Sequence, residues 1–526
     1  MKSTIRHFFC AAALFCSTSS AIAAKDEIDL PDFGNSANAG ISERDEYYYA
    51  LSFLRSMRNA GVLIEDPELV EYLRTLATRL SESSDKPEQS VGFFLVNEDA
   101  FNAFAVPGGV IGVNSGLILQ AAKESELASV LAHEIAHVTQ KHAVRSMERT
   151  QKASLPIMLG TLALMAAASQ SNSRSSSDAG QAAMVSGMAL MQQLKINYTR
   201  DNEFEADRIG IRSLKRAGFD VNSMPAMFAR MQSLYRTSSG NRVPQYLQTH
   251  PISVTRVAEA KARALELGGP PVPERDYKFK LMRERVRVLQ AKDFPKLIRY
   301  YEATIAARGS LPALHYGHAM ALSYAGDYAN ARTALQKIQF DAKLPLAQRN
   351  LLGLSKRLLS LEIAERAKET ASWTEGYAKL LNAHPRHRVI GMRFANALVN
   401  LASKTSAGQA VEILRELSTA YESDPGVYEL LARAYEISGQ NARAAESYAR
   451  ASAYRGALED SLAQLQNLTR RTDLSFYERS RVDALMAEIT PIVLEIRERE
   501  NRTGPAPNRQ VRAGFDAAFG AGAALY

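Results

Sequence analysis

The most regular pattern of apolar and polar positions lies between residues 126 and 143, which read ELASVLAHEIAHVTQKHA. Apolar side chains recur there at spacings of three and four, without Gly or Pro, so the stretch predicts a helix with Ser125 as a candidate N-cap. Alanines fill much of the remaining surface, which makes the helix apolar around most of its circumference. We therefore expect this helix to be buried and its polar groups to need partners.

Shorter patterns surround this helix. Residues 91–96 and 104–113 are expected to form strands, with a Pro-Gly-Gly turn inside the second stretch. Residues 67–82 are expected to form a helix, and a later helix is expected to run to Ala217 and end at Gly218. Residues 25–268 thus predict an α+β domain that is mostly helical with a small sheet.

The sequence changes character after residues 269–273, a linker whose Gly and Pro content suits neither a helix nor a central strand. Residues 274–500 have an almost entirely helical pattern, and three stretches fit the tetratricopeptide repeat, a pair of closely packed helices. Two copies centre on Gly326 and Gly439, and a looser copy with an insertion spans residues 393–421. The positions that fit in the two clearer copies are Ala319, Leu322, Tyr328, Ala331, Leu335, Tyr428, Leu431, Ala432, Tyr435, Ala444, Tyr448 and Ala451. One match would suit an ordinary helical hairpin, but three favour an all-α solenoid with a concave surface for protein ligands.

The two ends of the chain are expected to lie outside this fold. Residues 1–24 combine a basic start, a short apolar stretch and a small-x-small cleavage site at residues 21–23, the pattern of a secretory signal peptide. Both cysteines, Cys10 and Cys16, fall in this segment, so the mature protein is expected to have neither a disulfide nor a cysteine-ligated metal. Residues 501–526 are rich in Gly, Ala, Pro and Asn and are expected to form a poorly ordered tail.

Charge narrows the range of partners. The chain has 64 Lys and Arg against 56 Asp and Glu, a formal net charge of +8. Loss of Lys2 and Arg6 with the signal peptide leaves 62 basic residues against 56 acidic ones, a charge of about +6. Because this excess is mild and spread along the sequence, nucleic acid is not an expected partner.

Residues 133–137, His-Glu-Ile-Ala-His, form an H-E-x-x-H motif within the predicted buried helix. Four residues are just over one helical turn, so His133 and His137 project from the same face and can share one Zn²⁺. Glu134 lies beside them as a candidate general base. The alternative, two surface histidines flanking a glutamate, suits a buried helix poorly, so the motif predicts a metallohydrolase with one zinc ion per chain. His142 lies outside this pair, near the helix end, where a solvated or C-terminal role is expected.

A catalytic zinc normally has three protein ligands and one open position. Residues 201–207, DNEFEAD, offer candidates for the third ligand. Glu203 and Asp207 are four residues apart and share one helix face. Spacing alone does not decide between Glu203 and Glu205.

The combination of HEIAH with N-E-x-E-A-D resembles the zincin-like metallopeptidase family of the HtpX proteases and the CAAX prenyl proteases. The resemblance implies that Glu203 is the third zinc ligand. It also implies that Asp207 belongs to the catalytic machinery together with Glu134. The role implied for Asp207 is to orient one of the zinc histidines. Residues 102–109 resemble the family's strand beside the active-site cleft, and Val110 to Val113 form a candidate edge for an extended substrate, with an ordinary hairpin as the alternative.

The sequence Thr249-His250-Pro251 and the following Arg256 extend the resemblance. In relatives with tetratricopeptide repeats this loop approaches the zinc, which implies that His250 is a fourth ligand in a resting state. Two alternatives stay open, a transition-state role after loop movement and a plain turn before a helix. Arg256 is expected either to anchor the loop or to bind a carboxylate.

Between the two zinc motifs, residues 155–168 are apolar, but a membrane-spanning helix needs about 20 such residues. A second apolar stretch carries Met184, Met188 and Met191 at helical spacing. Both stretches are expected to pack on the protein as a mobile lid and not to span a membrane, with peripheral membrane association left open.

Nearly all of the mature chain resembles exported peptidases of the BepA type, which join an H-E-x-x-H domain to tetratricopeptide repeats. The resemblance implies a periplasmic zinc endopeptidase with chaperone activity. Such a protein would help outer-membrane β-barrel proteins to assemble at the β-barrel assembly machinery and would degrade those that stall. The alternatives are an assembly chaperone with a largely latent peptidase, and a general periplasmic housekeeping protease.

Overall fold

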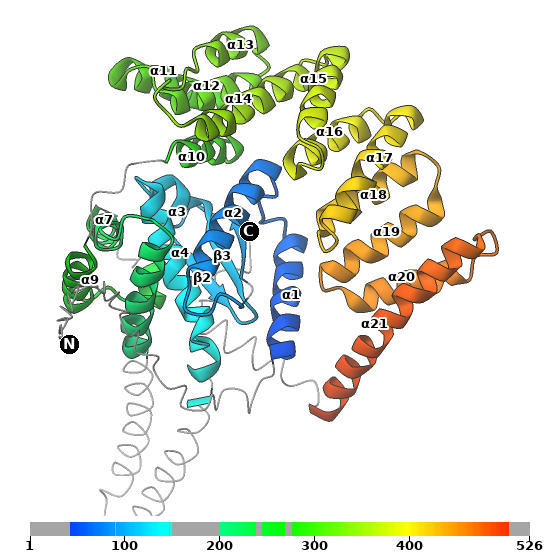
Figure 1. Cartoon of the computed structure of the whole chain (residues 1–526), viewed down its shortest axis with the longest axis horizontal. Helices are drawn as coiled ribbons and strands as arrows, with labels where there is room; N and C mark the ends of the chain where they lie inside the picture. Colours follow the sequence, from blue (N-terminus) through cyan, green and yellow to red (C-terminus); the bar gives the residue numbers. More distant parts are fainter. Residues whose placement is uncertain are drawn as a thin grey trace, which may run out of the picture. The chain divides into compact units, whose positions relative to one another are not determined.

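A computed structural model of the chain describes residues 43–89, 91–146, 148–149, 199–237, 245–268 and 276–503. Four predicted features lie outside these residues: the signal peptide, the linker at 269–273, the tail after Thr503, and the two apolar stretches, of which the first covers 155–168 and the second carries Met184, Met188 and Met191. The described chain confirms a mostly helical protein with a small sheet (Figure 1). Within the described ranges, every helix is too short or too polar to be a candidate membrane span.

One three-stranded sheet lies in the first half of the chain. Its strands are β1 (Gly92–Val96), β2 (Ala103–Val106) and β3 (Val110–Asn114), in the order β1-β3-β2. β3 pairs in parallel with β1 and antiparallel with β2. The expectation that Val110 to Val113 forms a free edge is therefore wrong, because both sides of β3 are occupied. The hairpin presents β2 at its outer edge instead, and β2 packs against helix α4.

Helix α4 (Glu124–Thr139) is buried at every position from Glu126 to Ala136, as its apolar pattern predicts. Its N-cap is Lys123, whose side chain makes no capping hydrogen bond, so the prediction of Ser125 as the cap is wrong. The Ser125 hydroxyl instead accepts a hydrogen bond from the backbone N–H of Asp220. The hydroxyl thus joins α4 to the segment that follows Gly218.

Six other helices of this half have bounds within the described residues. They are α1 (Glu43–Asn59), α2 (Pro67–Glu82), α3 (Ser115–Gln120), α7 (Ser223–Thr237), α8 (Gln245–Thr249) and α9 (Val254–Leu267). Residues 199–216 are also helical and end in a turn at Gly218, whose φ is 73°. This helix lies so close to α4 that a Cβ on Gly210 would be 3.1 Å from the backbone nitrogen of His133.

The second half of the described chain is entirely helical. Its helices are α10 (Tyr277–Leu289), α11 (Phe294–Arg308), α12 (Pro312–Tyr324), α13 (Tyr328–Gln336), α14 (Leu346–Arg366), α15 (Thr370–Ala383), α16 (Arg388–Asn400), α17 (Lys404–Ala420), α18 (Pro425–Ile437), α19 (Asn441–Tyr454), α20 (Leu458–Thr469) and α21 (Phe476–Thr503). Consecutive helices pack on one another from α11 to α21, although α13 and α14 are joined by a longer connection.

The three predicted repeats correspond to the pairs α12–α13, α16–α17 and α18–α19. Gly326 and Gly439 turn the first and third pairs with φ values of 86° and 82°. In the second pair the left-handed position is occupied by Ala402, with φ of 52°. The sequence match is looser there because the turn lacks its glycine and residues 404–408 form the first turn of α17.

The two halves share a core. One cluster of buried apolar side chains runs from α2 through the sheet and α4 to α10, α12 and α14. Two further clusters fill the region from α14 to α19 and the region from α19 to α21. Helices α10 to α14 therefore belong physically with the first half of the chain as well as with the second.

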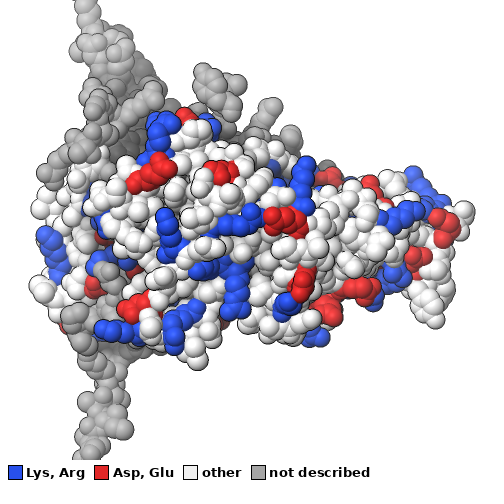
Figure 2. Space-filling model, turned by 90° about the horizontal axis from the view of Figure 1, so that it is seen from above, with Lys and Arg blue, Asp and Glu red and all other residues white. Residues whose placement is uncertain are grey.

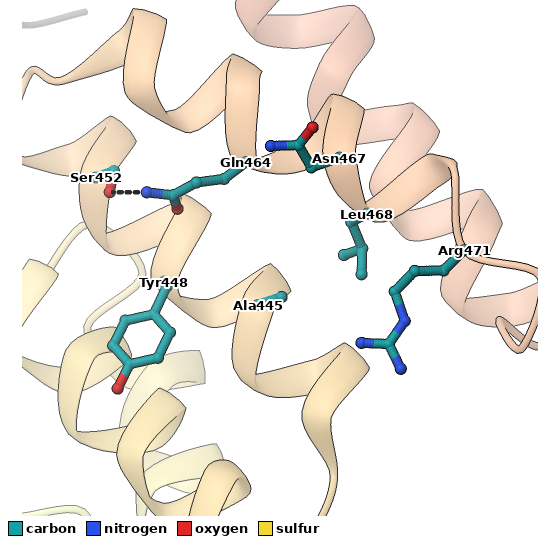
Figure 3. A pocket seen from close by; sticks show the side chains of 7 residues that line it. All are labelled: Ala445, Tyr448, Ser452, Gln464, Asn467, Leu468 and Arg471. Carbon is teal, nitrogen blue, oxygen red and sulfur yellow. Dashed lines mark hydrogen bonds between the residues drawn. The ribbon is translucent and has the colours of Figure 1, made fainter.

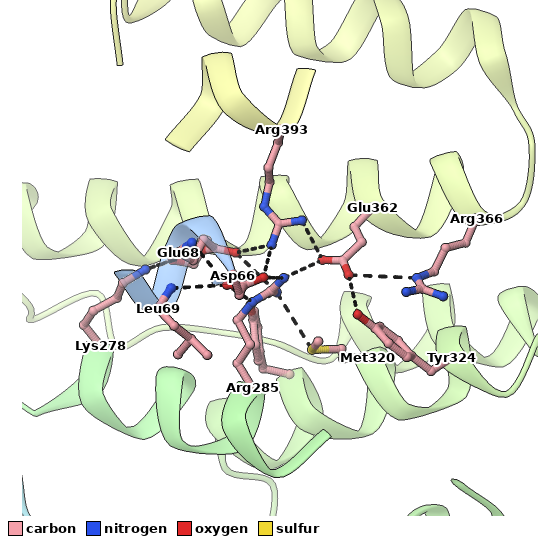
Figure 4. A network of polar contacts seen from close by, with 12 residues as sticks. Asp66, Glu68, Leu69, Lys278, Arg285, Met320, Tyr324, Glu362, Arg366 and Arg393 are labelled. Carbon is pink, nitrogen blue, oxygen red and sulfur yellow. Dashed lines mark hydrogen bonds and ion pairs between the residues drawn. The ribbon is translucent and has the colours of Figure 1, made fainter. Parts of the chain in front are cut away.

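A buried network of charges strengthens this junction (Figure 4). The Asp66 carboxylate caps α2 and accepts hydrogen bonds from Arg285 at 2.7 and 2.8 Å and from Arg393 at 2.8 Å. Arg285 also contacts Glu362 Oε2 at 3.0 Å. Burial disfavours the charge on Asp66, but the two guanidinium groups hold its pKa well below the ordinary value of 3.8.

The surface carries charges of both signs. On the face drawn in Figure 2, basic and acidic side chains are interspersed. A pocket of about 410 Å³ opens between α19 and α20 (Figure 3). Its lining residues are Ala445, Tyr448, Ser452, Gln464, Asn467, Leu468 and Arg471.

Candidate metal centre

Four side chains from three separate segments meet beside α4. They are His133 and His137 on α4, Glu203 on helix 199–216, and His250 directly after α8. Each offers one potential ligand atom, and these atoms all lie within 4.8 Å of one another. The structure thus brings together the three residues that the sequence predicts as ligands and the histidine that it predicts as a fourth.

The donor atoms converge from several directions. His133 Nε2 and His137 Nε2 are 3.0 Å apart, and each lies 3.3 Å from one oxygen of Glu203. His250 Nδ1 lies 2.9 Å from Glu203 Oε1. A tetrahedral zinc ion with ligands at about 2.0–2.2 Å needs donor atoms about 3.3–3.6 Å apart, so His133, His137 and Glu203 fit the ion after small adjustments.

Small residues explain how two helices bring these groups so close. Ala136 of α4 packs on Ala206 and Ile209 of helix 199–216, and Gly210 faces the backbone of His133. A larger side chain at Gly210 would push the helix that carries Glu203 away from the histidines. The helix contact therefore sets the distance between Glu203 and the imidazole rings.

Asp207 and Arg256 form a second layer behind the cluster. Asp207 Oδ1 lies 2.9 Å from His133 Nδ1, and Arg256 holds the same carboxylate through two hydrogen bonds of 2.7 and 2.8 Å. Arg256 also lies 2.8 Å from Glu203 Oε2 and donates to the carbonyl oxygen of Pro251. Arg256 thus both binds carboxylates and anchors the His250 loop, so the two roles that the sequence leaves open are combined in one side chain.

Glu134 is placed differently from these paired groups. Its carboxylate is buried, and its Oε1 has no hydrogen-bond partner among the described residues. The nearest ionisable partner is His250, whose Nε2 lies 3.7 Å away. Burial raises the pKa of Glu134, although the neighbouring imidazoles of His250 and His133 and a backbone hydrogen bond from Ala105 of β2 oppose this shift.

Tyr246 holds both the ring and the backbone of His250. Tyr246 stacks on the imidazole with ring centroids 4.7 Å apart and an interplanar angle of 26°. The His250 backbone N–H donates to the Tyr246 carbonyl oxygen, and Phe101 packs edge-on against Tyr246. Only 8% of His250 is exposed, so its side chain is buried within the cluster.

The interpretation of His142 as a solvated or C-terminal residue is wrong. Only 3% of His142 is exposed, and its Nδ1 lies 2.8 Å from His137 Nδ1. Its Nε2 lies 3.1 Å from Glu205 Oε2, so Glu205 supports His142 while Glu203 faces the donor cluster. A signal for His142 does exist in the sequence, because a third histidine lies five residues after His137 and an acidic residue lies two positions from Glu203. Tyr246 carries no comparable signal.

Comparison with known proteins places this cluster in a wider context. Residues 67–264 match the model of Peptidase family M48. The beta-barrel assembly-enhancing protease of Yersinia pestis is 33% identical over 475 residues, which cover 88% of this chain and 91% of the relative. The protein of the same name from Escherichia coli is 31% identical over 470 residues, with the same coverage of 88% and 91%. The mitochondrial metalloendopeptidase OMA1 of Schizosaccharomyces pombe is 28% identical over 186 residues, 35% of this chain and 50% of the relative.

Proposed function

Because the chain belongs to peptidase family M48, a family of zinc metallopeptidases, we propose that it cleaves peptide bonds at the cluster beside α4. His133, His137 and Glu203 are the proposed zinc ligands. The observation that carries the proposal is the convergence of these donors next to a buried, unpaired Glu134 oxygen.

The residues divide the work of hydrolysis between them. Zinc, when bound, supplies Lewis acidity that polarises a peptide carbonyl and makes water more acidic. Glu134 accepts a proton from the attacking water and gives it to the leaving amine, and its buried Oε1, which has no hydrogen-bond partner among the described residues, is available for this transfer. Asp207 Oδ1 lies 2.9 Å from His133 Nδ1, a contact that favours the tautomer with its proton on Nδ1 and leaves His133 Nε2 free to bind the metal.

We further propose that His250 occupies a coordination position in the resting enzyme. Its contact with Glu203 Oε1 and its stacking on Tyr246 support this role. A His250→Ala variant is then expected to cleave an unstructured protein such as casein faster than the unmodified enzyme. A fall to background activity would instead favour the transition-state role.

The decisive test of the proposed chemistry is Glu134→Gln. The variant keeps the size and most contacts of the side chain but lacks the basic carboxylate. It is expected to bind one zinc per chain and to lose cleavage by about 100-fold or more, the usual contribution of a positioned acid–base residue. Full activity in a zinc-loaded Glu134→Gln protein would refute the assignment.

The names of the relatives support a more specific role. We propose that the protein works in the periplasm, enhances the assembly of outer-membrane β-barrel proteins at their assembly machinery, and degrades barrels that stall. The predicted tetratricopeptide repeats, with the pocket between α19 and α20, are the proposed surface for these partners. A strain that carries only Glu134→Gln tests this role through its resistance to large antibiotics. The comparison is with a strain that lacks the protein. Partial recovery of antibiotic resistance by Glu134→Gln fits the proposal, and full recovery favours an assembly chaperone with a latent peptidase.

A general housekeeping protease would not depend on the helical second half to choose clients. Removal of residues 274–500 is a poor test of this alternative, because helices α10 to α14 share the core of the first half. Substitution of Arg471 in the pocket leaves that core intact. A housekeeping protease should keep its client range in Arg471→Ala, whereas the proposed role predicts selective loss of clients.

A further inference from the structure

The chain reverses direction just after α4. Lys141 follows the C-cap Gln140 with a left-handed φ of 51°, an uncommon conformation for a residue with a side chain. The Lys141 ammonium lies 3.6 Å from Glu46 Oε1 on α1, and less than a tenth of either side chain is exposed. This turn, pinned to α1, brings His142 back against the outer side of His137.

His142 connects His137 to the protein surface. Its Nδ1 lies 2.8 Å from His137 Nδ1, and its Nε2 lies 3.1 Å from Glu205 Oε2. Glu205 is 38% exposed and also lies 3.5 Å from Arg145 Nη1. The three side chains therefore form one line of contacts from the donor cluster outward.

The hydrogen positions along this line follow from the chemistry of imidazole. A neutral histidine has one protonated nitrogen and one acceptor nitrogen. If His137 Nε2 binds a metal, its proton is on Nδ1, so His142 Nδ1 must be the acceptor. The proton of neutral His142 is then on Nε2, where it meets the Glu205 carboxylate. Every donor faces an acceptor in this arrangement.

We propose that His142, supported by Glu205, is a positioning residue of the metal centre. It fixes the orientation and the tautomer of His137, just as Asp207 does for His133. A hydrogen bond to the outer nitrogen also makes the inner nitrogen a stronger donor to the metal. This inference rests on the proposed assignment of His137 as a zinc ligand.

Two substitutions in the full-length protein separate the hydrogen bond from the packing. His142→Phe keeps a planar ring without an acceptor, and His142→Asn places an amide oxygen near the position of Nδ1. The zinc dissociation constant, measured by competition with a chelating dye, is expected to rise about 10- to 100-fold in His142→Phe, the usual effect of removing such a partner. His142→Asn should recover much of this loss. His384→Phe, the same change at an exposed histidine, should leave zinc binding unaltered.

A readout independent of activity tests the tautomer directly. In zinc-loaded protein with ¹⁵N-labelled histidine, the Nδ1 shift of His137 should be that of a protonated, hydrogen-bonded nitrogen and should move in His142→Phe. Equal zinc affinity in the Phe variant, or equal losses in the Phe and Asn variants, would overturn the proposal. If the metal-free Phe variant fails to unfold cooperatively, Glu205→Ala at the partly exposed end carries the test, with an expected loss of about 10-fold.

His137→Ala distinguishes failure of this inference from failure of the proposed function. If His137→Ala binds zinc normally, the ligand assignment itself is wrong. If His137→Ala loses zinc while both His142 variants keep it, only the positioning role is wrong.

Discussion

Replacement of Asp66 should destabilise the junction between the two halves of the chain by two separable amounts. Asp66→Asn keeps an excellent N-cap for α2, because Asn and Asp cap equally well, but it removes the charge that pairs with Arg285 and Arg393. Removing one partner of a buried ion pair costs about 3–5 kcal/mol, and Arg285 is fully buried. Asp66→Ala also removes the cap, which adds about 1 kcal/mol.

The assay is urea unfolding of the full-length protein followed by far-ultraviolet circular dichroism. The matched control is Asp460→Asn, which breaks an ion pair with Arg55 at a similar distance of 2.6 Å but at an exposed site. This pair should contribute less than about 1 kcal/mol. The reasoning is refuted if Asp66→Asn costs no more than Asp460→Asn, or if the Asn and Ala variants at position 66 are equally stable.

Four other outcomes are expected. The pKa of Asp66 is lowered in the fold, so its stabilising contribution is complete well above 3.8 and is lost as the pH falls below that value. The urea concentration at the unfolding midpoint should therefore fall more with decreasing pH in the unmodified protein than in Asp66→Asn. Incubation with 1,10-phenanthroline should abolish casein cleavage, and added zinc should restore it, whereas a peptidase indifferent to the chelator would contradict the metal assignment. Gly210→Ala should cost about 1–3 kcal/mol in urea unfolding and weaken zinc binding, because the new methyl group meets the backbone of His133 at 3.1 Å, while Gly353→Ala in open space on α14 should not destabilise. Ala402→Gly should stabilise by about 0.5–1 kcal/mol in the same assay by relieving a φ of 52°, and a loss of stability would show that the turn is not strained.

The sequence predicts best where a single segment determines the outcome. Helix α2 covers the predicted residues 67–82, and α4 follows the spacing of its apolar side chains. The turns at Gly326 and Gly439 were also predictable, because glycine favours the left-handed conformation that each turn requires.

Predictions fail where the outcome depends on segments distant in sequence. Ser125 has the residue type of a cap, but the backbone of Asp220 takes its hydroxyl. Val110 to Val113 was expected to be an edge, yet parallel pairing with β1, in addition to the hairpin with β2, places this strand in the middle of the sheet. His142 reaches His137 only because Lys141 adopts a left-handed turn that Glu46 pins from α1. None of these partners is evident from local spacing.

The network at Asp66 has a consequence for the point during synthesis at which the chain can fold. Asp66 precedes α2, whereas its partners Arg285 and Arg393 lie much later in the sequence. A growing chain that has reached only Glu203 and His250 holds every proposed zinc ligand but still has an unpaired Asp66. We expect such a chain to remain loosely folded until residue 393 has emerged. Peptidase activity would then begin only after helices α10 to α15 have been made, so a chain that ends just after the proposed ligands has little opportunity to cut indiscriminately.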